Sequence, residues 1–209
     1  MGCLTSNAGE TSDTAKKTKP RVVFVVGGPG CGKGTQCKKI VQEFKYVSFS
    51  TGDLLRKYVS DGTSPDAKEL ADDMQAGRLI STDKLMKILR AAITTSKEPK
   101  ILIDGFPRNQ ENLNFWKKEM KDIAEVRAAL YFQVTDEEMA KRLAGRNEGR
   151  ADDNEETIKK RIETFTNETK PIIEALETEG KLIKIDAMKT VDEIFEDVKK
   201  AFKEKNLCQ

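Results

Sequence analysis

The apolar residues of the chain gather in short runs that alternate with amphipathic stretches. Residues 21–26, RVVFVV, form a continuous run rich in β-branched side chains, typical of a strand buried on both faces in a parallel sheet. Similar runs at 46–49, 101–104, 128–134 and 181–186 predict four more strands. Helical spacing appears between the runs, for example in residues 35–44, where Ile40, Val41 and Phe44 share one face. The alternation predicts an α/β fold with a five-stranded, doubly wound parallel sheet flanked by helices.

A glycine-rich segment, GGPGCGKGT, fills residues 27–35 between the first predicted strand and the first predicted helix. Gly27, Gly32 and Lys33 satisfy the G-x-x-x-x-G-K part of a phosphate-binding P-loop, in the strand–loop–helix context that this motif requires. Gly34 stands where a serine or threonine normally reaches Mg²⁺. The segment therefore predicts a nucleotide phosphate site and raises the question of how a metal is held.

Length and composition are those of an ordinary globular protein. The 209 residues carry a net charge of +2, which gives no indication of nucleic-acid binding. The four cysteines lack the spacing of a zinc site or of a disulfide framework, which favours a reducing compartment, and the absence of histidine excludes imidazole chemistry. Because no apolar run approaches the roughly 18 residues that a membrane span needs, we expect a cytoplasmic protein.

The first twenty residues form a segment of their own. Residues 1–20 are rich in small and polar side chains without apolar periodicity, so we expect a disordered tail. The tail begins with M-G-x-x-x-[ST], completed by Ser6, which makes Gly2 a candidate for myristoylation and the neighbouring Cys3 a candidate for palmitoylation. Two acyl chains would support membrane association, since one myristoyl chain binds only marginally. An unmodified tail that happens to begin with Met-Gly is the alternative.

Four motifs follow one another along the chain: GGPGCGKGTQ, STGDLLR, DGFPR and GRADDNEETIKKR. In this order, from about residue 20 to the C-terminus, the chain resembles the short-lid nucleoside monophosphate kinases, the family of adenylate kinase and UMP/CMP kinase. The resemblance implies a P-loop NTPase domain over 21–209, with a helical flap over the monophosphate at about 50–80 and a short lid at about 145–155. It also implies reversible, Mg²⁺-dependent phosphoryl transfer from ATP to a nucleoside monophosphate. In this family K-G-T replaces K-[ST], so Gly34 is no defect.

The resemblance assigns roles to individual residues. The catalytic set would be Lys33, Asp104, Arg108, Arg146, Arg150 and Arg161, as expected for a reaction that depends on positioning and positive charge rather than on a general base. Thr35 and Asp104 would hold Mg²⁺ through water. ATP would contact Gly28, Pro29, Gly30, Cys31, Gly32, Lys33, Gly34, Thr35, Arg146 and Lys189. The monophosphate would contact Thr51, Arg56, Gly77, Leu79, Ile80, Gly105, Arg108, Asn112, Arg150 and Arg161.

Arginine usage supports these roles. Lysines outnumber arginines 27 to 10, yet four of the ten arginines fall in the motifs and a fifth, Arg146, lies three residues before the last of them, and arginine suits bidentate phosphate binding. Position alone would place Arg161 on the solvated face of a helix whose core side carries Ile158, Ile162 and Phe165, but the surrounding motif favours the phosphates.

The predicted lid, AGRNEGRADDN, contains two neighbouring carboxylates. Either Asp152 or Asp153 could cap the following helix, with Asp153 and Glu156 as a capping-box-like pair, and in the family these carboxylates also tie the closed lid to the arginines. The segment is about two residues shorter than in typical animal members, which makes the pairing of Arg146 less secure than that of Arg150.

Two residues give opposite indications about the acceptor base. Asn112 lies in RNQENLNFW, which has the R-N-Q-x-N-L-x-x-W pattern that UMP/CMP kinases share, whereas adenylate kinases have a glutamine at that place. Thr51 is the adenylate kinase choice, where UMP/CMP kinases usually have alanine. We give the longer string more weight and expect UMP or CMP, with AMP as the alternative. Asn112 could also be simply a polar residue in the first turn of a helix that begins near Asn109.

A hypothesis of another class is a membrane-tethered nucleotide sensor with little turnover. Lys33, Asp104 and Arg108 are all present, which favours an enzyme, and the sequence has neither the N-K-x-D nor the D-x-x-G motif of a regulatory GTPase. The expected partners are ATP, ADP and nucleoside mono- and diphosphates. The family implies a monomer.

Overall fold

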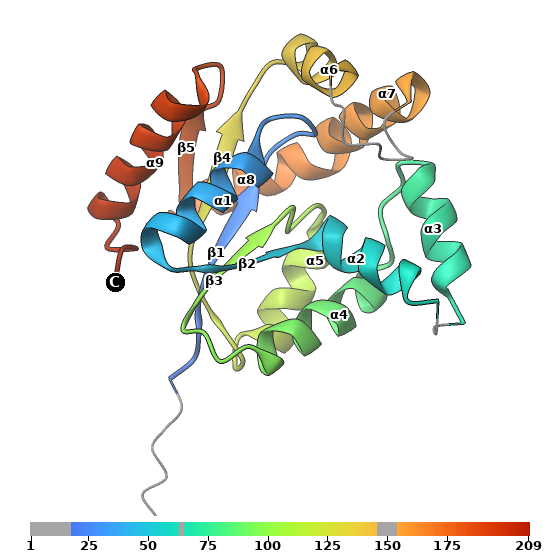
Figure 1. Cartoon of the computed structure of the whole chain (residues 1–209). Coiled ribbons are helices and arrows are strands. Elements are labelled where there is room, and N and C mark those ends of the chain that lie inside the picture. The colour runs from blue at the N-terminus through green and yellow to red at the C-terminus, as the bar shows by residue number, and fades with distance from the viewer. Residues whose placement is uncertain (1–17, 63–64, 146–153) are drawn as a thin grey trace, which may run out of the picture.

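The computed structural model describes residues 18–62, 65–145 and 154–209. Its centre is a sheet of five strands in the order β2-β3-β1-β4-β5, and every neighbouring pair is parallel (Figure 1). The strands are β1 (Arg21–Val26), β2 (Val47–Ser50), β3 (Lys100–Asp104), β4 (Glu125–Gln133) and β5 (Leu182–Asp186). The predicted five-stranded parallel sheet is therefore confirmed, and its strands end at one common edge.

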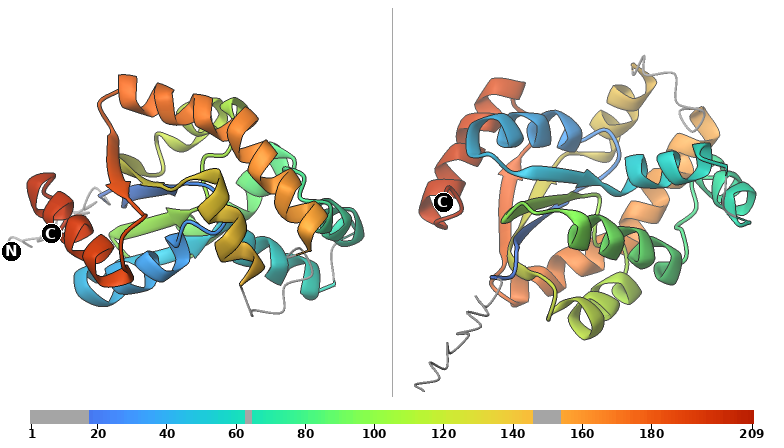
Figure 2. Two further views of the ribbon diagram at one scale, coloured as in Figure 1. Left: turned by 90° about the horizontal axis from the view of Figure 1, so that it is seen from above. Right: turned by 60° about the horizontal axis from the view of Figure 1, so that its bottom comes forward.

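Helices cover both faces of the sheet (Figure 2). Val23 and Val25 of β1 pack into the layer formed by α1 (Lys33–Phe44) and α9 (Val191–Glu204). Val22 and Phe24 point to the opposite layer. That layer contains α4 (Thr82–Thr95), α5 (Gln110–Phe115), the π-helical turn η1 (Trp116–Met120) and α8 (Lys170–Thr178). Because successive side chains of a strand alternate between faces, the continuous apolar run of β1 fills two cores at once.

The remaining helices surround the edge at which the strands end. They are α2 (Thr51–Ser60), α3 (Ala67–Gln75), α6 (Asp136–Ala144), α7 (Glu155–Thr164) and the π-helical turn η2 (Phe165–Thr169), which joins α7 to α8. The segment 50–80, expected to form the flap, contains α2 and α3 on one side of the sheet (Figure 1). Most of the expected lid, residues 146–153, lies outside the described residues, as do residues 1–17 of the tail.

The predicted strand boundaries agree with the structure to within one residue, except at the start of β4, where backbone pairing extends beyond the apolar run. β4 begins at Glu125, three residues before the predicted start, since its first residues pair with β1 although their side chains are exposed or half-buried. Pro20, which the sequence assigned to the tail, is bonded to the sheet, because its carbonyl accepts a hydrogen bond from the Glu125 N–H at 2.9 Å. Hydrophobicity marks the buried part of a strand and leaves its polar end unmarked.

The start of α7 corrects the prediction about its cap. The N-cap residue is Asn154, whose Oδ1 accepts the Thr157 N–H at 2.9 Å, rather than Asp152 or Asp153, which lie outside the described residues. Asparagine caps helices about as well as aspartate, which explains why Asn154 can serve as the cap. With this cap, α7 begins one residue later than a cap at Asp153 would require. Ile158 and Phe165 are buried, and Ile162 packs against the cluster that contains Phe165, as the helical spacing predicts.

No helix in the described part of the chain is long and apolar enough to cross a membrane.

Candidate active site

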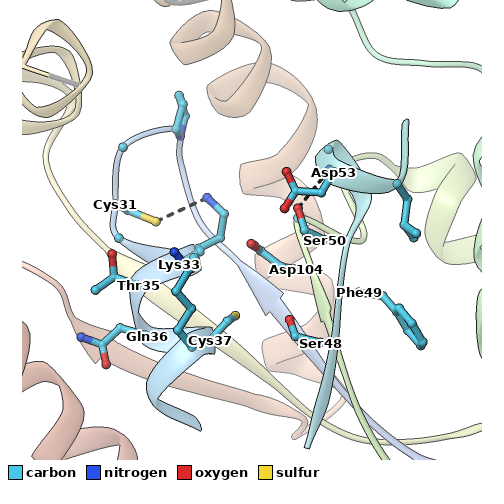
Figure 3. A pocket seen from close by; sticks show the side chains of 18 of the residues that line it. Cys31, Lys33, Thr35, Gln36, Cys37, Ser48, Phe49, Ser50, Asp53 and Asp104 are labelled. Atoms are coloured by element: carbon cyan, nitrogen blue, oxygen red, sulfur yellow. Dashed lines mark hydrogen bonds between the residues drawn. The ribbon is translucent and has the colours of Figure 1, made fainter. Parts of the chain in front are cut away.

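A cleft of about 1590 Å³ opens at the edge where the strands end. Figure 3 shows its floor, with Lys33 and Thr35 on the P-loop side and Asp53 and Asp104 across from them. The cleft is lined by residues of all the described motifs: Pro29 to Thr35 from the P-loop, Gly52, Asp53 and Arg56 after β2, Asp104, Gly105 and Arg108 after β3, and Arg161 from α7. The structure therefore gathers segments separated by more than one hundred residues around one site.

The P-loop presents positive charge to this cleft. The Lys33 ammonium donates hydrogen bonds to the carbonyls of Gly27 and Gly28, both at 2.8 Å, and lies 3.5 Å from Cys31 Sγ (Figure 3). No side chain caps the N-terminus of α1, so the first backbone N–H groups of this helix are available to an anion. Together the helix end and the ammonium form a site suited to phosphate groups.

The P-loop also packs tightly against α6. A Cβ atom on Gly28 would lie 2.0 Å from Met139 Sδ and 3.3 Å from Phe165 Cδ1, whereas ordinary contacts begin near 3.4 Å. Met139 is fully buried in a cluster with Val26, Phe165 and Ile173. Glycine is thus required at position 28 because the loop backbone lies directly against this buried cluster. The cluster in turn limits how closely the P-loop can approach α6.

Asp104 and Thr35 present the hard oxygen donors that Mg²⁺ prefers. Asp104 ends β3 and Thr35 lies in the first turn of α1, and both line the cleft. Within the described ranges, no group of three or more His, Cys, Asp or Glu residues could hold a metal ion. Mg²⁺ is commonly held by one or two carboxylates together with substrate phosphates and water, so this donor set fits a metal that arrives with a nucleotide.

The thiol of Cys37 lies close enough to Asp104 to be affected by its charge. Burial raises the pKa of Cys37 well above its usual range, and the nearby charge of Asp104 raises it further. The thiol is therefore uncharged at neutral pH and adds no negative charge to a site that must attract phosphates.

Arg108 is held in place through both its backbone and its side chain. Its Nε donates to the Gly105 carbonyl at 2.8 Å and its guanidinium donates to Thr51 Oγ1 at 3.3 Å. Its backbone N–H donates to Asn112 Oδ1 at 3.1 Å, and its carbonyl accepts the hydroxyl of Thr169 at 2.7 Å. These contacts hold the backbone of Arg108 and its guanidinium in fixed positions at the cleft.

Two of the residues predicted to contact the acceptor lie behind the cleft wall. Thr51 is 1% exposed, and its hydroxyl donates to the carbonyls of Asp104 and Gly105, at 3.1 and 3.2 Å. Asn112 is 2% exposed, and its Nδ2 donates to Thr82 Oγ1 at 2.9 Å. The polar atoms of both side chains are thus bonded within the protein, and contact of Asn112 with a base stays a prediction.

The other described acceptor residues reach the site. Gly77 and Ile80 line the cleft, and Leu79 lines an adjoining pocket of about 90 Å³ that Arg108 and Arg161 also line. Arg56 forms an ion pair with Asp53 on α2. The predicted residues Arg146, Arg150, Gly2 and Cys3 fall outside the described residues.

The connection from β5 to α9 also lines the cleft. Lys189 is one of its lining residues and pairs through its ammonium with Asp197 at 2.7 Å, and contact of Lys189 with ATP stays a prediction. Gln36 is a lining residue that sequence reasoning missed: it is 2% exposed, and its Nε2 donates to the Val191 carbonyl at 2.8 Å. Its position directly after the P-loop motif is the signal that could have found it.

Two further cleft arginines were also missed. Arg142 on α6 lines the cleft and pairs with Glu138 at 2.7 Å. Arg78 lines it from the predicted return of the flap and pairs with Asp73 at 2.7 Å. Arg78 stands between two predicted site residues and so carried a local signal, whereas Arg142 precedes the motif that guided the prediction.

The comparisons with known proteins agree with this geometry. The family model described as adenylate kinase matches residues 25–181. The chain is 43% identical over 188 residues to the UMP-CMP kinase of Danio rerio, covering 87% of this chain and 96% of the relative. It is 44% identical over 184 residues to UMP-CMP kinase 3 of Arabidopsis thaliana, covering 88% and 90%, and 42% identical over 191 residues to the UMP-CMP kinase of Bos taurus, covering 88% and 97%. The chain therefore belongs to the adenylate kinase family and is a nucleoside monophosphate kinase.

Proposed function

We propose that this protein catalyses the reversible, Mg²⁺-dependent transfer of a phosphoryl group from ATP to UMP or CMP, which yields ADP and the nucleoside diphosphate. The observation that carries the proposal is the single cleft that the P-loop, Asp104, Arg108 and Arg161 line together. Relatives named UMP-CMP kinase that match most of this chain support the pyrimidine acceptor.

The donor phosphates would lie on the P-loop. Backbone N–H groups from Gly28 to Gly34 would bind them at the N-terminus of α1, and Lys33 would leave its carbonyl partners to follow the transferred group. Asp104 and Thr35 would hold Mg²⁺ through water, and the ion would neutralise phosphate charge when bound. ATP would extend from the P-loop toward Lys189, which lines the same cleft.

The acceptor phosphate would lie between arginines from separate elements. Arg56 and Arg108 would hold it, and Arg161 would bridge donor and acceptor phosphates. Its oxygen is already an anion, so the transfer needs alignment and positive charge and no general base.

Arg146 and Arg150 would complete the positive site from the lid. The segment 50–80, with α2 and α3, would act as a flap over the monophosphate. Closure of lid and flap would exclude water, which would otherwise compete with the acceptor for the phosphoryl group.

The internal bonds of Thr51 weaken the argument for AMP. Its hydroxyl is directed to two backbone carbonyls and to Arg108 rather than into the cleft. A threonine at this place therefore supports the arginine loop and is compatible with a pyrimidine. Contact of Asn112 with the base, predicted from the sequence, would require Asn112 to exchange one of its present partners, so the role that its bonds favour is support of the Arg108 loop.

A coupled assay with ATP and Mg²⁺ tests the proposal by comparing kcat/KM for CMP, UMP, dCMP and AMP in one preparation. We expect a preference of at least about tenfold for CMP and UMP, which corresponds to about 1.4 kcal/mol of differential transition-state binding. A preference for AMP would make the protein an adenylate kinase in activity. No turnover with any acceptor would favour the nucleotide sensor.

We further propose that the protein is a cytoplasmic monomer that associates with membranes through myristoylation of Gly2 and palmitoylation of Cys3. The proposal rests on the sequence M-G-C with Ser6. If Gly2→Ala partitions between membrane and soluble fractions as the parent does, the lipid anchor is refuted.

A further inference from the structure

The first turn of α7 is bonded to the end of α3. The Thr157 hydroxyl donates to the Gln75 carbonyl at 3.1 Å, across 82 residues of sequence. Thr157 is 6% exposed, and its own N–H is held by the Asn154 cap. Figure 1 shows the start of α7 above the end of α3, on the side of the sheet where the flap is expected. This hydrogen bond therefore joins the helix that carries Arg161 to the segment that carries the predicted acceptor residues.

Gly77, two residues beyond Gln75, lies against the same face of α7. Its φ is +67°, and a Cβ atom there would lie 3.1 Å from Arg161 Cγ and 3.2 Å from Thr157 Cγ2. Thr157 and Arg161 are four residues apart in a helix and so project from one face. The aliphatic stem of Arg161 thus rests on the Gly77 backbone, next to the hydroxyl that fixes this segment.

This packing bears on how Arg161 reaches its phosphates. An arginine side chain loses rotamer entropy when it is ordered. A stem already seated on a backbone surface loses less freedom when its guanidinium binds, which favours tight alignment. Gly77 and Arg161 both line the large cleft and the smaller pocket beside it, so the seat lies at the site rather than at a distance from it.

We propose that Thr157 is a positioning residue for Arg161: by fixing the Gln75 carbonyl, it holds Gly77 under the arginine stem and so aligns the guanidinium for phosphoryl transfer. The inference rests on the proposed function only in assigning Arg161 to the phosphates. In this proposal the segment around Gly77, which carries predicted acceptor residues, supports Arg161, the residue proposed to contact both the donor and the acceptor phosphates.

Thr157→Val tests the proposal because valine keeps the shape and removes the hydroxyl. We expect kcat/KM for CMP to fall about fivefold to tenfold, the effect of losing one typical hydrogen bond, while KM for ATP changes less than twofold. Thr157→Ser keeps the hydroxyl and should stay within twofold of the parent. Thr178→Val is the matched control, since the Thr178 hydroxyl donates only to the Glu174 carbonyl of its own helix, at 3.0 Å on the surface.

A second comparison separates positioning from a general loss of stability. In an Arg161→Ala background, adding Thr157→Val should cost less than twofold, because the two residues act as a unit. A full fivefold loss in that background, or a Thr157→Val enzyme with parental kcat/KM, would overturn the proposal. If the parent protein transfers phosphate to no acceptor, the proposed function fails. The role of Thr157 is then tested by calorimetry, which measures the affinity for CMP in the presence of ADP. The same variants should change this affinity by the same factors as those given for kcat/KM.

Discussion

Replacing Asn112 with alanine separates two roles for this residue: supporting Arg108 and recognising a base. The substitution removes the acceptor of the Arg108 N–H, at 3.1 Å, and the donor to Thr82 Oγ1, at 2.9 Å. It leaves the cap of α5 in place, because Asn109 Oδ1 accepts the backbone N–H of residue 112. The change therefore acts on the Arg108 loop and spares the start of the helix.

The magnitude follows from what the substitution leaves unpaired. A partly buried N–H without a partner costs about 1–3 kcal/mol, and the second lost bond about 1 kcal/mol, so we expect Asn112→Ala to lower the free energy of unfolding by about 2–4 kcal/mol. Of the two bonds that hold the Arg108 backbone, only the one from Thr169 remains. A shift of about 1 Å in a positioning group can cost up to about 100-fold, so we expect kcat/KM for the acceptor to fall about 10- to 100-fold.

The assay compares the loss of kcat/KM for UMP, CMP and AMP in the same Asn112→Ala preparation. Because Arg108 is proposed to hold the phosphate that all three acceptors share, the three losses should agree within about threefold. Asn114→Ala is the control: its side chain lies on the same helix, is exposed and contacts only Gln110 at 2.8 Å, so stability and kcat/KM should stay near parental values. A loss confined to the pyrimidines, with AMP unchanged, would refute this reasoning and make Asn112 a reader of the base.

Three further outcomes are expected. Lys33→Met keeps the length of the side chain and removes its charge, so the rate constant of phosphoryl transfer in single-turnover experiments should fall at least about 100-fold. A fall of less than tenfold would contradict the proposed role of the Lys33 ammonium. In urea unfolding, Gly28→Ala should destabilise the protein by about 1–3 kcal/mol and Met139→Ala by about 2–5 kcal/mol. The double variant should cost at least about 1 kcal/mol less than the sum of the two, because removing the Met139 side chain makes room for the new methyl group at position 28. Strictly additive losses would contradict this contact. Since burial raises the pKa of Cys37, its thiolate forms only well above neutral pH, and iodoacetamide at about pH 8 should label the partly exposed Cys208 in the native protein and leave Cys37 unmodified, as mass spectrometry of tryptic peptides would reveal.

The sequence predicted the sheet and the location of the cleft because both depend on local patterns. A buried parallel strand must be apolar on both faces, and β1 carries that signal in five consecutive residues, Val22 to Val26. Residues that follow parallel strands meet at one edge, which is why the P-loop and Asp104 could be assigned to one site before their contacts were known. The polar start of β4 had no such signal and was missed.

Side-chain partners were harder to predict because they depend on contacts between distant segments. Periodicity places Asn112 in the first turn of a helix, yet only the fold brings Thr82 and the Arg108 N–H to its amide. The contact of Thr157 with Gln75 spans 82 residues and follows no repeat in either helix. Sequence patterns thus identify which residues face the core, whereas the partner of a buried polar group is decided by tertiary packing.

Arg108 and Arg161, two of the described arginines proposed to contact the acceptor phosphate, are supported in different ways, and this difference has a functional consequence. Arg108 is bonded to Gly105 and Thr51, which directly follow the ends of β3 and β2, so the sheet fixes its position. Arg161 instead rests on Gly77, in the segment proposed to move over the acceptor. Loss of support for Arg108 should therefore lower stability and activity together, whereas loss of support for Arg161 should lower activity with little effect on stability. A kinase built in this way would hold one phosphate contact through the sheet and a second through the segment proposed to cover the acceptor, so a change in that segment would reach Arg161 before it reached Arg108.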